Sequence, residues 1–116
     1  MEIEKQGKQV IDPTMLEQMV GDDLEIQAKL IKGFIDSMER SLIKLDEYYS
    51  AQSPLEYGRM AHQLKSSSRV FGGVELGDLL EGLEKAGRSQ NWSAIEDRHH
   101  LVQPAFQFLK QYYINR

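Results

Sequence analysis

The sequence contains no cysteine and only three prolines among its 116 residues. The lack of cysteine excludes disulfide bonds, thiolate zinc sites, iron–sulfur clusters and c-type haem attachment. Long apolar runs are also missing, so we expect neither a membrane-spanning helix nor a signal peptide. Basic residues are outnumbered 14 to 18, and the net charge of −4 argues against general binding to nucleic acid or to an anionic membrane. We expect a single cytoplasmic domain.

Apolar residues between the prolines recur every three or four positions, which is the period of an amphipathic helix. Five helices are predicted on this basis, over 13–20, 23–49, 54–71, 76–87 and 92–113. Gly21 ends the first of them, Asp22 or Asp23 caps the second, and Pro104 predicts a kink in the last.

The connections between the long helices are short, which favours antiparallel neighbours, and the alternating pattern of β-strands does not occur. The sequence therefore predicts an all-α fold. We expect an antiparallel up-and-down four-helix bundle with an extra short N-terminal helix over 12–116, preceded by a flexible lead over 1–11.

The third predicted helix carries a histidine that should face solvent. At about 100° of rotation per residue, His62 points away from the apolar face of this helix and shares its own face with two cations, Lys65 and Arg69. A neutral imidazole is a good nucleophile near pH 7, and cations beside it can offset the charge of a bound phosphoryl group. Gly58 and Ser66 lie on the same face and are small, so a second protein could approach the ring.

Residues 61–84, AHQLKSSSRVFGGVELGDLLEGLE, resemble the core motif of histidine-containing phosphotransfer (HPt) domains. In that motif Ala-His-x-Leu-Lys-Gly is followed by small residues, by a glycine ten positions after the histidine, and by a leucine-rich helix that ends near Leu-Glu. The matching positions are Ala61, His62, Leu64, Lys65, Gly72, Leu76, Leu79, Leu83 and Glu84. Ser66 stands where the family most often has glycine. The five-helix outline extends the resemblance over nearly all of the chain after the first ten residues.

The resemblance implies a phosphocarrier of a two-component phosphorelay that has no ATP-dependent kinase activity of its own. His62 would accept a phosphoryl group from the aspartate of a response-regulator receiver domain and pass it to another receiver, with Lys65 as the charge partner of the phosphoryl group. The neighbours of that group would be Gly58, Gln63, Ser66 and Arg69. No cofactor is implied, because Mg²⁺ would belong to the receiver.

The expected partners are receiver domains, a hybrid sensor histidine kinase, or both, and the chain itself would be a monomer or the C-terminal module of such a kinase. In HPt domains the short first helix lies near the active histidine, so Met15 and Met19 are candidates for receiver docking. Gly72 is expected to have a structural role, because it can supply the helix-ending conformation that a side chain would strain.

Three other functions are disfavoured by the residues present. In a sensor-kinase dimerisation domain an acidic residue usually follows the histidine, whereas here it is Gln63, and no nucleotide-binding glycine motif occurs. No metal is expected, since no His-Glu-x-x-His or repeated Glu-x-x-His motif is present. His99 is instead predicted to be a hydrogen-bonded, partly buried core residue, and His100 a surface residue. Nothing indicates a hydrolytic nucleophile with its base.

The alternative that stays open is a helical-bundle adaptor, which would bind a partner without phosphorylation and would not use His62.

Overall fold

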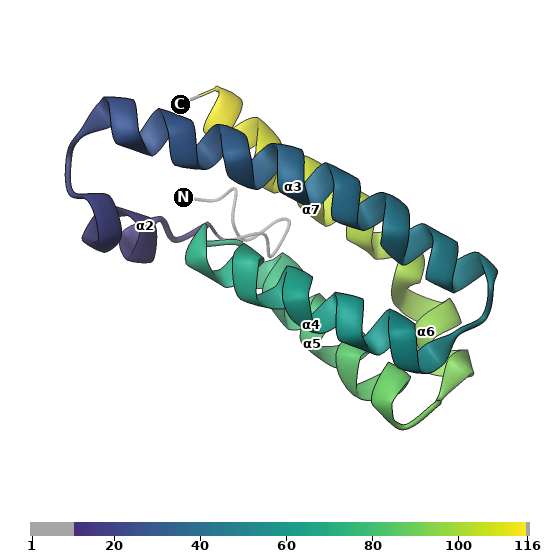
Figure 1. Ribbon diagram of the computed structural model, residues 1–116. Helices are drawn as coiled ribbons and strands as arrows, with labels where there is room; N and C mark the ends of the chain where they lie inside the picture. The colour runs from purple at the N-terminus through teal and green to yellow at the C-terminus, as the bar shows by residue number, and fades with distance from the viewer. Residues whose placement is uncertain (1–10, 116) are drawn as a thin grey trace.

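The computed structural model describes residues 11–115. The elements in order are α2 (Thr14–Val20), α3 (Leu24–Ser50), α4 (Pro54–Val70), α5 (Val74–Arg88), α6 (Trp92–Arg98), the 3₁₀ turn η1 (His99–Leu101) and α7 (Val102–Ile114). Helix α4 packs along α5 and against α3, while α7 contacts both α5 and α3, which closes a four-helix bundle (Figure 1). The short α2 adjoins the beginning of α3. The predicted all-α bundle with an extra N-terminal helix is therefore confirmed.

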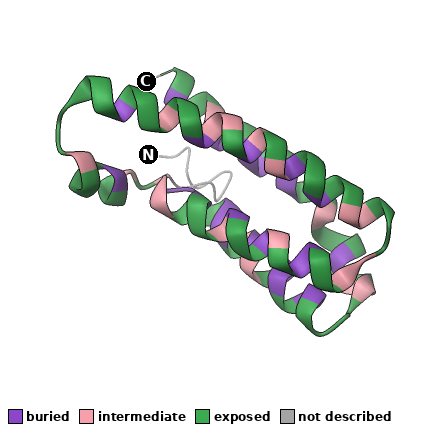
Figure 2. Ribbon diagram, in the orientation of Figure 1, coloured by how far each residue is buried: buried purple, intermediate pink, exposed green. Residues whose placement is uncertain are grey.

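Buried residues recur along each long helix between exposed ones (Figure 2), and most of the buried residues are apolar. Fully buried side chains of the long helices include Met38, Leu45, Tyr57, Leu76, Leu80, Leu83, Phe106 and Leu109. Their spacing of three, four or seven residues within a helix keeps them on one face, and burial of that face stabilises the helices against one another. No helix within residues 11–115 is long and apolar enough to cross a membrane.

Local sequence signals fix several helix ends. At the start of α3 the Asp23 carboxylate accepts hydrogen bonds from the backbone N–H groups of Glu25 and Ile26, at 3.1 and 3.2 Å. At the end of α4 Gly72 adopts φ 79°, and its Cβ, if it had one, would lie 2.1 Å from the carbonyl oxygen of Asp12. Gly72 therefore accommodates both a left-handed backbone and a close approach of the chain that enters α2.

Most of the predicted lead lies outside the described residues. Ile11, its last residue, forms an isolated antiparallel bridge with Gly73, and the backbone N–H of Asp12 donates to the carbonyl of Gly72 at 2.8 Å. The connection between α4 and α5 thus holds the chain just before α2.

The predicted boundaries of the fourth and fifth helices were wrong. The last predicted helix is interrupted by η1, so that α6 ends at Arg98 and α7 begins at Val102. The interruption precedes Pro104 because the proline ring would clash with the carbonyl of His100 in a regular helix, whereas a proline in the first turn of α7 costs little. Gly87 does not end α5 either; the helix continues to Arg88, and Gln90 takes the left-handed conformation after it, with φ 56°.

Candidate functional site

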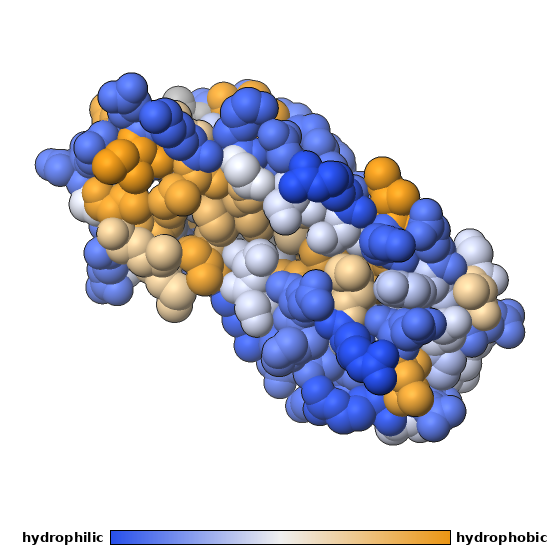
Figure 3. Space-filling model, in the orientation of Figure 1, coloured by the Kyte–Doolittle hydropathy of each residue, from blue (hydrophilic) through white to orange (hydrophobic). Residues whose placement is uncertain are grey.

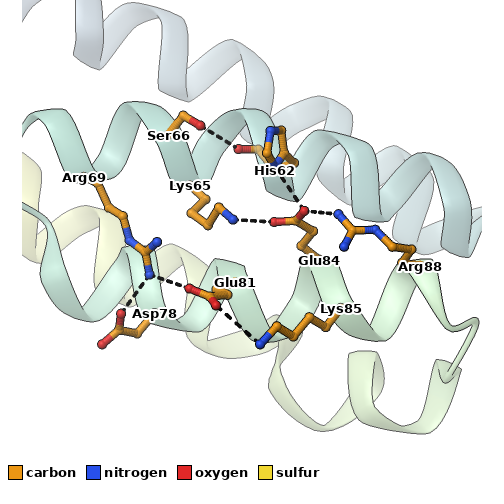
Figure 4. A network of polar contacts seen from close by, with 9 residues as sticks. All are labelled: His62, Lys65, Ser66, Arg69, Asp78, Glu81, Glu84, Lys85 and Arg88. Atoms are coloured by element: carbon orange, nitrogen blue, oxygen red, sulfur yellow. Dashed lines mark hydrogen bonds and ion pairs between the residues drawn. The ribbon is translucent and has the colours of Figure 1, made fainter.

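His62 projects from α4 into solvent with 57% of its side chain exposed, as its place in the helix predicts. Its Nδ1 atom nevertheless has a fixed partner, the Oε2 atom of Glu84 on α5, at 3.0 Å (Figure 4). The Glu84 side chain is only 6% exposed, so this carboxylate lies beneath the ring between the two helices. The imidazole is accessible on one side and anchored on the other.

Two glycines bring Glu84 within reach of His62. Gly58 of α4 is buried against α5, and a Cβ at this position would lie 3.2 Å from the carbonyl oxygen of Glu84. A Cβ at Gly87 would lie 2.5 Å from the carbonyl oxygen of Pro54 and 2.7 Å from the Cα of Gly58. The small size of Gly58 therefore serves the close approach of α4 and α5, a role that the sequence analysis did not predict.

Three positively charged or hydrogen-bonding groups surround the Glu84 carboxylate. The Nζ atom of Lys65 lies 2.7 Å from Oε1, while the Arg88 guanidinium and His62 both contact Oε2. Burial disfavours the charged form of Glu84, but the hydrogen bond and charge of Lys65, followed by those of His62, outweigh it and hold the pKa below its ordinary value. Glu84 is consequently ionised at neutral pH.

The ionised carboxylate determines which ring nitrogen of His62 carries the proton. A carboxylate without a proton can only accept hydrogen bonds, so the Nδ1–H of His62 must be the donor in the contact with Glu84. In the neutral ring the lone pair then belongs to Nε2, which points away from Glu84 (Figure 4). The arrangement therefore offers a solvent-facing nucleophilic nitrogen of fixed tautomer and orientation.

Lys65 and Arg69, the two cations predicted beside His62, contact different carboxylates of α5. Lys65 is directed at Glu84 and its side chain is 18% exposed, so its charge acts first on the carboxylate beneath the ring. Arg69 contacts Asp78 and Glu81 of α5, at 3.0 and 2.7 Å, and forms a separate network beside the site (Figure 4). The expectation that Arg69 faces His62 is corrected by these contacts, because two carboxylates on α5 lie within reach of its long side chain.

Ser66 contacts the backbone of His62, and Gln63 lines a hollow that His62 also lines. The Ser66 hydroxyl donates to the backbone carbonyl of His62 at 3.3 Å, a common contact of serine within a helix. Gln63 lines a hollow next to His62 with a volume of about 450 Å³. The other residues that line this hollow are Leu55, Gly58, Arg59, Glu84 and Arg88.

Met15 and Met19 are exposed on α2, with 48% and 61% of their surface accessible, while Leu16 between them is buried. Apolar side chains gather at the end of the molecule where α2 meets the beginning of α3 (Figure 3). Met15 lines a hollow that Arg69 also lines, distinct from the one beside His62. Docking of a receiver at these methionines stays a prediction.

The remaining histidines lie away from this site. His99 is bonded at Nδ1 to the Tyr57 hydroxyl at 2.6 Å and at Nε2 to Asp46 at 2.9 Å, which confirms the predicted core role. Burial raises the pKa of Tyr57, so its hydroxyl keeps the proton that it donates to His99. His100 is exposed, as predicted. Within residues 11–115 no three histidine, aspartate or glutamate side chains gather in a way that could hold a metal ion.

Glu84 and Arg88 contact the site but were not placed there from sequence, and Arg59, which lines the neighbouring hollow, was not singled out. Glu84 belongs to the motif quoted above, but its contact with His62 depends on how α4 and α5 cross. Arg88 follows it by one helical turn, a spacing that indicates an ion pair. Arg59 precedes His62 by three residues and therefore lies on the same face of α4.

Comparison with known proteins identifies the family of this chain. The family model of the Hpt domain matches residues 29–112. The chain belongs to the Hpt domain family. Its role is accordingly histidine phosphotransfer in a two-component phosphorelay, in which Hpt domains work with receiver domains and kinases.

The fold of this Hpt domain is similar to that of a solved protein. The structure of this chain matches the crystal structure of histidine-containing phosphotransfer protein B (HptB) from Pseudomonas aeruginosa PAO1 with a TM-score of 0.84, at 18% sequence identity. The match covers 90% of this chain and 91% of that chain. No curated protein sequence matches this Hpt domain.

Proposed function

We propose that His62 is the phosphoacceptor of this Hpt domain and that the phosphoryl group is carried on Nε2. The observation that supports the assignment is the contact between Nδ1 and the buried, ionised Glu84, at 3.0 Å, on a histidine whose other nitrogen is exposed. No other described histidine combines these properties, because His99 is hydrogen-bonded through both ring nitrogens and the structure shows no anchoring contact for His100.

The transfer itself needs little from this chain beyond a well-placed lone pair. The Nε2 lone pair attacks the phosphorus of an aspartyl phosphate on a receiver domain, an N–P bond forms, and the P–O bond breaks with its electron pair going to the aspartate carboxylate. The ring keeps its Nδ1 proton and gains positive charge, which the Glu84 carboxylate stabilises. In the reverse direction a receiver carboxylate attacks phosphorus and the neutral ring leaves.

Lys65 and Arg88 contribute through Glu84 in this scheme. Lys65 keeps the carboxylate ionised and, with Arg88, fixes its position beneath the ring. Mg²⁺ would be held by the receiver, and we assign no metal or cofactor to this chain. As partners we propose receiver domains, a hybrid sensor histidine kinase, or both, and we propose that the chain acts as a cytoplasmic monomer without kinase activity of its own.

The test is phosphorylation by a phosphorylated receiver domain with Mg²⁺, followed by intact-mass measurement. The wild-type protein should gain one phosphoryl group that is labile in acid and stable in base, and His62→Gln should gain none while its helical circular dichroism stays unchanged. His100→Gln is the matched control, because His100 is also exposed, and it should be phosphorylated normally. Phosphate on His62→Gln would refute the assignment, and an adaptor that binds receivers without phosphorylation would show no mass gain in any variant.

A further inference from the structure

The cations around His62 differ in whether the chain itself neutralises them. Lys65 and Arg88 are paired with Glu84, and Arg69 is paired with Asp78 and Glu81. Arg59 is exposed and, among the residues that the structure describes, forms no ion pair. Its charge is therefore left for a group outside this chain.

Arg59 borders the hollow of about 450 Å³ beside His62. Leu55 also lines this hollow, and 46% of its surface is exposed. Leu55 precedes His62 by seven residues, which is about 10 Å along the helix. A phosphoryl group on Nε2 is therefore too small to contact Leu55. A protein that covers His62 would reach both residues.

We infer that Arg59 and Leu55 form a docking contact for the receiver domain, in which an acidic side chain of the receiver lies against Arg59 and an apolar one against Leu55. This inference rests on the proposed function. A receiver that carries a phosphorylated aspartate and binds Mg²⁺ must present carboxylates near the reacting phosphorus, so an unpaired cation beside the acceptor nitrogen complements it. The chain as a whole is acidic, with a net charge of −4. An acidic receiver surface is therefore attracted at Arg59 and repelled by the acidic remainder of the chain, which favours one orientation of the receiver.

The experiment compares two phosphoryl donors of different size. One is a phosphorylated receiver domain with Mg²⁺, and the other is phosphoramidate, a small reagent that transfers its phosphoryl group to Nε2 with release of ammonia. The variants are Arg59→Glu and, as a control with the same charge reversal, Arg40→Glu. Arg40 is exposed on α3 and does not line the hollow.

Arg59→Glu should lower kcat/KM for transfer from the receiver by about tenfold, and the loss should shrink as salt is added. The rate with phosphoramidate and the lifetime of phosphohistidine should stay at the wild-type values. Arg40→Glu should leave all three quantities unchanged. Leu55→Ala should weaken transfer from the receiver without affecting the small donor.

Three results would overturn the inference in different ways. If Arg59→Glu slowed both donors equally or shortened the phosphohistidine lifetime, Arg59 would serve the phosphoryl group rather than the receiver. If Arg59→Glu behaved like Arg40→Glu with the receiver, docking would lie elsewhere on the surface. If the wild-type protein accepted phosphate from neither donor, the proposed function itself would fail, which the wild-type measurement alone reveals.

Discussion

Replacing Glu84 by glutamine tests whether the buried carboxylate governs the reactivity of His62. Glutamine has almost the same shape, so it fills the space between α4 and α5 without a cavity. It carries no charge, and its amide can present a hydrogen-bond donor to Nδ1 as well as an acceptor. The substitution therefore removes the reason for the proton to stay on Nδ1, and we expect a mixture of the two ring tautomers.

The cost can be worked out from the contacts. A hydrogen bond to a charged group contributes about 1.5–3 kcal/mol. His62 is 57% exposed, so water competes for Nδ1 and the lower end of that range applies. A loss of about 1.5 kcal/mol corresponds to a roughly tenfold slower transfer. The free energy of unfolding should fall by about 2 kcal/mol, because Lys65 loses the partner of a mostly buried ammonium group while glutamine still accepts one hydrogen bond.

Two measurements check the Glu84→Gln prediction. Nitrogen-15 NMR of the imidazole reports the tautomer, and rapid-quench kinetics with a phosphorylated receiver report the transfer rate. Glu81→Gln is the matched control, since Glu81 lies on the same helix and pairs with Arg69 instead of His62. A variant at position 84 that kept the wild-type tautomer and the wild-type rate would refute the role of the carboxylate.

Two further predictions concern the framework. Burial lowers the pKa of His99 below its ordinary value of 6.5, against the opposing effect of Asp46. Folding therefore favours the neutral ring, so the stability that His99 contributes should be complete above pH 6.5 and decline as the pH falls. Urea unfolding should show that the difference in unfolding free energy between the wild type and His99→Gln narrows toward pH 5. A difference that stays constant with pH would contradict this. Gly87→Ala should cost about 1–3 kcal/mol of unfolding free energy and slow transfer, because its Cβ meets the Pro54 carbonyl. Gly82→Ala, where a Cβ meets nothing, should be neutral or stabilising, and equal melting temperatures for the two alanine variants would argue against a close helix approach.

The sequence was sufficient for features that depend on neighbours along the chain. The period of the apolar residues defined the four long segments of the bundle, and rotation along α4 placed His62 outside the core. The ends of α3 and α4 were predictable because an aspartate cap and a left-handed glycine act within a few residues. The apolar period also continues through η1, which is why the break between α6 and α7 escaped prediction.

The contacts of the site could not be predicted in the same way, because they cross from α4 to α5. Rotation along α4 put Arg69 on the same side as His62, but the partners that orient its guanidinium belong to the neighbouring helix. The role of Glu84 likewise depends on the distance between the helices at Gly58 and Gly87. The long side chains of arginine and lysine can reach several carboxylates. Their direction therefore depends on which carboxylates the packing of the helices brings near, and not on helical periodicity alone.

The pairing of the cations separates chemistry from recognition in this domain. Charge that is neutralised within the chain, as at Lys65 and Arg88, cannot attract a partner strongly, but it fixes Glu84 and through it the reactive nitrogen. Arg59 forms no ion pair among the described residues, so its charge is available to a partner. Changes at Glu84 should therefore slow transfer from every phosphoryl donor, large or small, whereas changes at Arg59 should matter only when the donor is a protein. Combining Glu84→Gln with Arg59→Glu should consequently give additive losses in log kcat/KM with a receiver, since the two residues act at different steps.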